Sequence, residues 1–337
     1  MIIKINDNGF LSEFDEANFI CVISSIETTL YYPISGVHRD YIRYTPALDV
    51  ELVFLGKTLT LKNPPVDSSL SPSPAVISRA CIELLDVKNL HINAGSFVKP
   101  KIPYINLDEN PTGRIEFGKA MENSKDLFKY GYMLGKNLEG KNLIIGESVP
   151  GGTTTALGVL RALNYNAKVS SGSIKNPHKL KEEIIGRGLR YIKNRKDIFS
   201  ILNAVGDKMM PVVAGLVKGF RGNILLAGGT QMAAVLAVIK EIDKSLLEKV
   251  ALATTEFVLY DKNSNLVEIV KDVGDLPIYA AKFDFEKSKL EGLKKYCEGA
   301  VKEGVGAGGL AVYAMDKGIK NREIREFIEE NIKKWYP

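Results

Sequence analysis

Residues 142–163 read NLIIGESVPGGTTTALGVLRAL, and this stretch decides the fold that we expect for the chain. Its first residues, 142–145, contain the apolar run 143–145, which suits a strand that is buried on both faces. Its last residues, 154–163, place apolar side chains at helical spacing. Glycine and threonine dominate the segment between them, so the stretch predicts a strand, a glycine-rich turn and a helix of a parallel α/β sheet.

The same alternation of short apolar runs and longer helical segments continues on both sides of this unit. We expect strands at Phe19–Ser24, Glu51–Leu55, Leu90–Ala94, Asn142–Gly146, Ala167–Ser171, Asn223–Ala227, Val250–Thr254 and Ile278–Phe283. We expect helices at Ala75–Leu85, Ser124–Leu138, Thr154–Leu163, Lys179–Ile192, Met210–Phe220 and Met232–Ile242. Two further segments, Phe257–Tyr260 and Leu266–Val270, are interpreted as a hairpin attached to the sheet.

After Phe285 only helical patterns remain, at Lys287–Lys302, Leu310–Asp316 and Arg322–Trp335. We therefore predict an α/β fold in which residues 1–283 form a Rossmann-like, mostly parallel sheet flanked by helices, with a nucleotide cleft. Residues 284–337 form a small helical C-terminal part. The proline-rich stretches Asn63–Pro74 and Ser96–Gly113 are expected to be long surface or cleft loops, and such loops in compact domains are often functional.

Composition excludes several classes of protein. The 337 residues are 45% hydrophobic and 25% charged, so the chain can bury a large core. The formal charge of +5 is small and both signs are interspersed, so nucleic acid is not an expected partner. The three cysteines form no CxxC pair and the three histidines lie far apart, which fits a reducing cytoplasm and predicts no metal centre. Acidic residues interrupt Met1–Phe19 and glycines interrupt Ile224–Ile239, so neither a signal peptide nor a membrane span is expected.

The glycine-rich turn 146–154 has the spacing of a phosphate-binding loop, GxxxxG followed by Gly-Thr. Gly152 occupies the position at which a P-loop has its lysine, and a triphosphate needs that cation. A single phosphate can instead be held by backbone N–H groups and hydroxyls at a helix N-terminus. Gly151, Gly152, Thr153 and Thr154 are the candidate phosphate ligands; the alternative is an ordinary tight turn between a strand and a helix.

A second glycine turn, with Gly228 and Gly229, follows another apolar strand and precedes an apolar helix. Glycine turns after parallel strands meet at the carboxyl edge of the sheet, where open α/β folds bind ligands. Neither turn has the GxGxxG spacing of a dinucleotide-binding fold.

A third glycine cluster lies at residues 302–310, KEGVGAGGL. Glycines at this density disfavour a helix and suggest close backbone approach to a ligand, with Glu303 at the edge. A carboxylate beside exposed N–H groups is well placed to accept a proton from a bound base. The alternative is a helix C-cap followed by a loop, with Glu303 in solvent.

These motifs resemble those of one enzyme family. The loop Gly146–Thr154 looks like the GExxxGxTT loop of the nicotinate-nucleotide:dimethylbenzimidazole phosphoribosyltransferases, and Glu303–Ala307 resembles the EGxGA motif of that family. The segments TPALD (Thr45–Asp49) and AGSFVKPKIP (Ala94–Pro103) look more like a divergent archaeal branch than like the bacterial enzymes. Three lysines follow the strand that precedes the phosphate-contacting lysine of the bacterial enzymes, and the sequence does not rank them: Lys175, Lys179 and Lys181.

The resemblance implies transfer of the phosphoribosyl group of nicotinate mononucleotide to a benzimidazole-type base, a step in the synthesis of the lower ligand of cobamides, without metal or cofactor. It implies that Glu303 is the general base and that the enzyme is a cytoplasmic homodimer whose partners are small molecules. The substrate-binding residues would be Glu147, Gly151, Gly152, Thr153, Thr154, Gly228, Gly229, Gly304 and Gly306. The sequence leaves open whether the acceptor is a benzimidazole, an adenine or a phenolic compound.

Two other functions stay open on the sequence alone. One is a kinase or ligase that uses the turn 146–154 as a P-loop, which the absence of its lysine disfavours. The other is a non-catalytic protein that binds a nucleotide or a corrinoid precursor.

Overall fold

One sheet crosses the whole molecule. The computed structural model describes residues 1–337. Eight strands pair in the order β1-β8-β7-β6-β5-β2-β3-β4, and all neighbours are parallel except β1 and β8. The strands are β1 (Ile2–Ile5), β2 (Ala17–Ile23), β3 (Asn89–Ala94), β4 (Ile105–Asp108), β5 (Asn142–Ser148), β6 (Asn223–Ala227), β7 (Val250–Thr255) and β8 (Ile278–Ala281).

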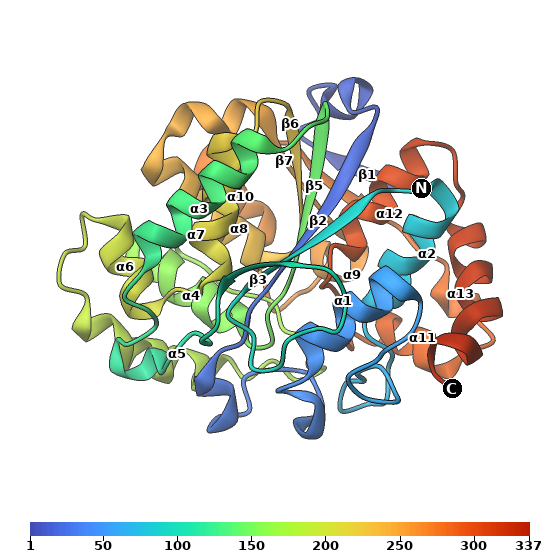
Figure 1. Ribbon diagram of the computed structural model, residues 1–337, viewed down its shortest axis with the longest axis horizontal. Coiled ribbons are helices and arrows are strands. Elements are labelled where there is room, and N and C mark those ends of the chain that lie inside the picture. Colours follow the sequence, from blue (N-terminus) through green and yellow to red (C-terminus); the bar gives the residue numbers. More distant parts are fainter.

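Helices cover both faces of this sheet (Figure 1). They are α1 (Thr45–Leu55), α2 (Ala75–Leu85), α3 (Ser124–Asn137), α4 (Gly152–Ala162), α5 (His178–Gly188), α6 (Ile198–Val205), α7 (Met209–Gly219), α8 (Thr230–Ile242), α9 (Glu256–Leu259), α10 (Leu266–Gly274), α11 (Glu291–Cys297), α12 (Ala307–Asp316) and α13 (Asn321–Trp335). Helices α3, α4, α7 and α8 lie on one side of the sheet, and α1, α2, α12 and α13 lie on the other. The predicted α/β fold, with helices flanking a mostly parallel sheet and a helical C-terminal part, is confirmed.

Each face of the sheet has its own apolar core. Along β6, Ile224 and Leu226 contribute to the core under α4, α7 and α8, whereas Leu225 and Ala227 contribute to the core under α2 and α12. This alternation follows from the period of two in a strand, and it explains why the central strands read as continuous apolar runs.

The strand order reverses between β2 and β5. From β2 the chain continues outward to β3 and β4, whereas β5 lies on the other side of β2 and the chain then continues through β6, β7 and β8. Ile23 and Ser148 pair at the carboxyl ends of β2 and β5. Loops that leave neighbouring strands in opposite directions open a crevice, and ligands of doubly wound sheets bind there.

Three predicted elements are wrong. The segment Glu51–Leu55 is the end of helix α1 rather than a strand, because a short buried apolar run does not distinguish the two. The predicted hairpin is instead the helices α9 and α10. Residues 167–171 form no strand, because the sheet places β5 directly beside β6 and leaves them no pairing partner.

Other differences concern chain ends and boundaries. Two short strands at the edges of the sheet, β1 and β4, were not predicted. The expected helix 287–302 is reduced to α11, which ends before Gly299, a residue with φ of 89°. The remaining expected strands and helices are present with boundaries shifted by a few residues. None of the helices combines the length and the apolar character that a membrane span requires.

We predict that the α3–α7 contact depends on the absence of side chains at its glycines. A Cβ atom added at Gly215 would lie 2.2 Å from the carbonyl oxygen of Phe128, so Gly215→Ala should lower the free energy of unfolding by about 1–3 kcal/mol. Gly186 in α5 has no atom within 4 Å of an added Cβ, so Gly186→Ala should raise stability by about 0.5–1 kcal/mol. Denaturant unfolding measures both. Equal effects of the two variants would contradict the packing argument.

Candidate functional site

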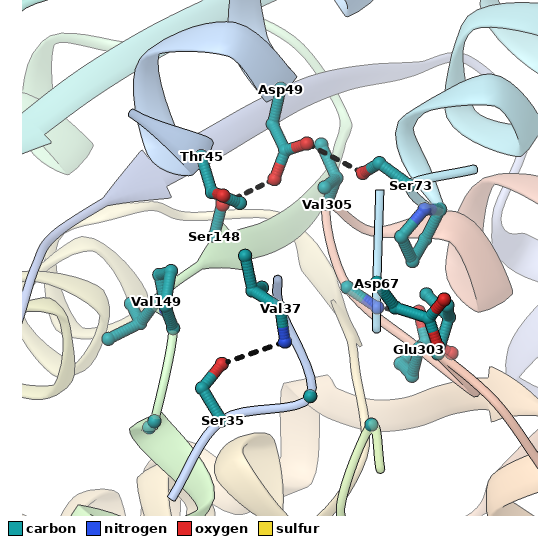
Figure 2. A pocket seen from close by; sticks show the side chains of 18 of the residues that line it. Ser35, Val37, Thr45, Asp49, Asp67, Ser73, Ser148, Val149, Glu303 and Val305 are labelled. Carbon is teal, nitrogen blue, oxygen red and sulfur yellow. Dashed lines mark hydrogen bonds between the residues drawn. The ribbon is translucent and has the colours of Figure 1, made fainter. Parts of the chain in front are cut away.

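A cavity opens where β2 and β5 end, at the point where the strand order reverses. Its walls are formed by Ile34–Val37 after β2, by Thr45 and Asp49 of α1, by Pro65–Asp67 and Ser73–Pro74 of the proline-rich loop, by Glu147–Thr153, by Ser171–Gly172, by Gln231 and by Val301 and Glu303–Val305. Figure 2 shows Asp49 between Ser148 and Ser73 on one side of this cavity and Glu303 on another. The structure therefore brings the first and third glycine motifs to one cavity, and the proline-rich loop forms part of its wall.

The N-terminus of α4 faces this cavity. Gly151, with φ of 82°, precedes the helix, and an added Cβ there would lie 2.5 Å from Thr29 Cγ2. A Cβ added at Gly152 would lie 2.2 Å from Gln231 Nε2, so any side chain at this position would require Gln231 to move. Thr153 lines the cavity, whereas Thr154 is buried beneath it and its Oγ1 has no hydrogen-bond partner.

One lysine lies directly beside this helix end. Lys181 Nζ is buried and donates to Thr153 Oγ1 and to the Ser170 carbonyl, both at 3.0 Å. Burial, together with the nearby charge of Lys302, lowers the pKa of Lys181 to about 7. Lys175 and Lys179 are exposed. Of the three lysines that the sequence could not rank, Lys181 is therefore the one beside the N-terminus of α4. We call residues 151–154 at this helix end the cradle.

Glu303 faces the same cavity from the loop before α12. Its Oε1 accepts hydrogen bonds from the amides of Gly304 (3.1 Å) and Gly308 (3.0 Å), and its Oε2 accepts one from Thr254 Oγ1 (3.2 Å). Burial raises the pKa of Glu303 to about 7, and the two amides oppose this rise. A carboxyl group that titrates near neutrality and lies in a cavity can accept a proton in a reaction.

The backbone that carries Glu303 is strained. Val301, Lys302 and Val305 have φ of 63°, 45° and 58°. Left-handed backbone costs roughly 1–2 kcal/mol for a residue with a side chain, and β-branched residues rarely adopt it. Strain of this kind persists only where the surroundings hold it, and it concentrates at functional sites.

Contacts with β5 fix this loop in place. The amide of Val305 donates to the Glu147 carbonyl at 2.7 Å. A Cβ added at Gly146 would lie 2.7 Å from Gly306 Cα, so the two glycines bring the backbones of β5 and the loop together. Gly304 lines the cavity, whereas Gly306 packs against Gly146 and the ring of Phe19.

The second glycine turn contributes to the cavity through a neighbouring side chain. Gly228 and Gly229 are not among the lining residues; added Cβ atoms there would meet Met232 Cγ at 2.7 Å and Val258 Cγ1 at 3.1 Å. Gln231, two residues further, is the residue of this turn that lines the cavity. Sequence reasoning missed it, because nothing in the sequence shows that α8 begins beside Gly152.

Two further buried carboxyl groups, those of Glu147 and Asp207, have raised pKa values. Burial, and then the charges of Asp207 and Glu303, raise the pKa of Glu147 to about 8. Asp207 accepts hydrogen bonds from Thr155 Oγ1 and from the Met209 amide, and burial raises the pKa of Asp207 to about 6.

Asp49 is a further buried carboxyl group in the wall. It accepts hydrogen bonds from Ser73 Oγ and Ser148 Oγ at 2.6 Å, and burial raises its pKa to about 6. Sequence reasoning missed its part in the site, although an acidic residue within the apolar run 46–55 was a signal. No group of three or more His, Cys, Asp or Glu side chains is arranged to hold a metal ion.

The fold has known counterparts among solved structures. The nicotinate-nucleotide-dimethylbenzimidazole phosphoribosyltransferase of Thermus thermophilus superposes with a TM-score of 0.64 at 12% identity, over 93% of this chain and 83% of that chain. A structure of CobT from the same organism gives a TM-score of 0.63 at 12% identity, over 92% of this chain and 83% of that chain. The chain thus has the fold of these phosphoribosyltransferases, as the two motifs led us to expect.

Sequence relatives define the family. The chain is 62% identical to the UPF0284 protein of Methanocaldococcus jannaschii, with 99% of both chains covered. It is 40% identical to the UPF0284 protein of Sulfolobus acidocaldarius over 96% of both chains, and 41% identical to that of Methanothermobacter thermautotrophicus over 93% of this chain and 91% of the relative. No protein-family model matches the chain. The protein belongs to the UPF0284 family, an archaeal branch that shares the fold of the phosphoribosyltransferases.

We predict that Glu147 makes stability depend on pH. Its pKa rises from 4.5 to about 8 on folding, so between these pH values the folded state keeps a proton that the unfolded state has lost. The free energy of unfolding should therefore fall as the pH rises through this window. The fall should be larger in the wild type than in Glu147→Gln, by on the order of a few kcal/mol. Denaturant unfolding at pH 5 and pH 9 measures this difference. Exposed Glu139→Gln should keep the pH dependence of the wild type, and the same pH dependence in Glu147→Gln would refute the assignment.

Proposed function

We propose that this protein transfers the 5-phosphoribosyl group from nicotinate mononucleotide to a nitrogen of a benzimidazole-type base, giving an α-ribazole phosphate and nicotinate. The observation that carries the proposal is the joint presence, in one cavity, of a helix N-terminus suited to a phosphate and of a carboxyl group suited to proton removal. The fold shared with a phosphoribosyltransferase, together with the two sequence motifs, supports the choice of this reaction.

Nicotinate can leave the donor without acid catalysis. The ring nitrogen of nicotinate mononucleotide is positively charged, so the bond to C1′ breaks with return of its electron pair to that nitrogen. Nicotinate then departs with a neutral ring nitrogen, and no acid has to protonate it.

The acceptor has to lose a proton. As one nitrogen of the benzimidazole attacks C1′ with inversion, its other nitrogen still carries a hydrogen, and the product becomes neutral when this proton leaves. Glu303 is the proposed general base, and the amides of Gly304 and Gly308 would hold its carboxylate in position.

The phosphate is proposed to bind at the N-terminus of α4. Backbone N–H groups and the helix dipole favour an anion there, and the ligands would be Gly151, Gly152, Thr153 and Thr154. Lys181 would add a positive charge close to Thr153 Oγ1. Its own lowered pKa follows from burial, so a phosphate dianion would supply the counter-charge that restores its protonation.

The other expected residues have supporting parts in this proposal. Glu147 would orient the glycine turn, and Gly228, Gly229, Gly304 and Gly306 would form or support backbone walls of the nucleotide site. We also propose that the protein acts as a homodimer in the cytoplasm, in the synthesis of the lower ligand of cobamides.

The test is a product assay with purified protein. Nicotinate mononucleotide is incubated with benzimidazole, 5,6-dimethylbenzimidazole, adenine or a phenol, and nicotinate and the ribosylated base are measured by chromatography and mass spectrometry. The proposal expects nicotinate release only when an acceptor is present. Binding of the nucleotide without release under any of these conditions would identify a binding protein instead and refute the proposal.

We predict that Glu303→Gln lowers turnover by roughly two to four orders of magnitude, because the amide cannot accept the proton. Nucleotide affinity, measured by calorimetry, should change little. In the wild type, kcat/KM should decrease as the pH falls below about 7, where Glu303 becomes protonated. The control is Glu298→Gln, which changes an exposed glutamate of the same segment. Unchanged turnover in Glu303→Gln would show that another group is the base.

We predict that Lys181→Met raises KM for nicotinate mononucleotide about 10- to 100-fold, the range expected for losing one charged hydrogen bond. The acceptor KM should change much less, since the lysine contacts Thr153 at the N-terminus of α4, where the phosphate is proposed to bind. Lys179→Met is the matched control, because Lys179 is exposed on the same helix. Initial-rate kinetics with each substrate varied separately distinguish the two variants. Equal KM values for Lys181→Met and Lys179→Met would contradict a phosphate contact.

A further inference from the structure

The residue before Glu303, Lys302, is a buried lysine that is not among the residues lining the cavity. Lys302 Nζ donates to the Ser171 carbonyl at 2.9 Å and lies 3.2 Å from Asp261 Oδ2. The side chains of Lys302 and Asp261 are 6% and 2% exposed, so the ion pair is almost fully removed from water. A buried pair of this kind is costly to break, because removal of one partner leaves the other charge without compensation.

Backbone hydrogen bonds also hold the loop on either side of the Lys302 side chain. The carbonyl of Lys302 accepts a hydrogen bond from Thr255 Oγ1, and the amide of Val301 donates to the Gly172 carbonyl at 2.9 Å. Lys302 adopts φ of 45°, and the valine on its N-terminal side adopts φ of 63°. The loop therefore keeps an unfavourable backbone conformation immediately before Glu303, and the Lys302 side chain is one of the contacts that hold it.

The same pair is connected to the phosphate cradle. Asp261 Oδ2 also accepts a hydrogen bond from Ser170 Oγ at 2.7 Å, and the Ser170 carbonyl accepts one from Lys181 Nζ at 3.0 Å. Lys181 in turn donates to Thr153 Oγ1. A continuous series of buried polar contacts thus runs from the N-terminus of α4 to the residue that precedes Glu303.

We propose that Lys302 and Asp261 are positioning residues that fix the Glu303 carboxylate relative to the cradle. They touch neither the reacting atoms nor the phosphate; they set the backbone from which Glu303 enters the cavity. The inference rests on the proposed function for its kinetic consequences, whereas its structural consequence, a loop held by the ion pair, does not depend on the reaction.

The kinetic test uses Lys302→Met, Asp261→Asn and the double variant in the transfer assay. Each single variant should lower kcat about 10- to 100-fold and change KM for nicotinate mononucleotide less than about threefold, the opposite pattern to Lys181→Met. The double variant should be no worse than the single ones, because both remove the same interaction. Lys302→Arg, which can still donate to Ser171 and pair with Asp261, should recover part of kcat.

A pH profile separates positioning from general damage. If Glu303 moves out of its buried position, its pKa returns toward its ordinary value of 4.5, and the acid limb of kcat/KM in Lys302→Met should shift to lower pH. A variant that is only less well folded would have a lower kcat/KM at every pH, and its acid limb would lie at the same pH as in the wild type. The control Lys287→Met removes an exposed lysine at the end of the 3-10 helix Phe285–Lys287 and should change neither quantity.

A second measurement does not need activity. Hydrogen exchange of a peptide covering residues 299–309 should be faster in Lys302→Met and Asp261→Asn than in the wild type and Lys287→Met, because the amides of Gly304 and Gly308 lose their acceptor when Glu303 moves. An inactive wild type with this exchange pattern would refute the proposed reaction and leave the loop assignment intact. An active wild type with unchanged kcat, acid limb and exchange in both variants would overturn the positioning role.

Discussion

The close approach of two backbones, at Gly146 and Gly306, is the contact on which the rest of the site depends. A Cβ at Gly146 would lie 2.7 Å from Gly306 Cα, and the amide of Val305 donates to the carbonyl of Glu147 in the same place. This contact joins the last third of the chain to the central strand β5. Because β5 leads into α4, the contact also brings Glu303 to the cavity that the N-terminus of that helix lines.

The electrostatics of the cavity follow from burial rather than from an excess of one charge. Asp49, Glu147, Asp207 and Glu303 all have raised pKa values, and burial is the largest cause for each. Lys181 has a lowered pKa for the same reason. Near neutral pH the Glu147 carboxyl is largely protonated, and Glu303 and Lys181 titrate there. Such a site is suited to a substrate that brings its own charges, as a phosphate and a cationic ring would.

The sequence predicted the parts of this structure that depend on local pattern. The strand, turn and helix of residues 142–163 are present. Glycine spacing and an isolated carboxylate are visible without a fold, and the structure brings residues of the first and third glycine motifs to one cavity. The segment 51–55 was misread because its neighbours, not its residues, make it a helix on the sheet. Asp49 left a signal, an acidic residue in an apolar run, that was not used. Gln231 and the Lys302–Asp261 pair could not be predicted, because tertiary contacts between distant segments create their roles.

A crystal structure with nicotinate mononucleotide bound would show whether the helix N-terminus and Glu303 act on one substrate. We expect the phosphate to contact the amides of Gly152 and Thr153 and to lie close to Lys181, with C1′ of the ribose turned toward Glu303. A phosphate bound outside this cavity, or a ribose whose C1′ faces away from Glu303, would contradict the proposed function.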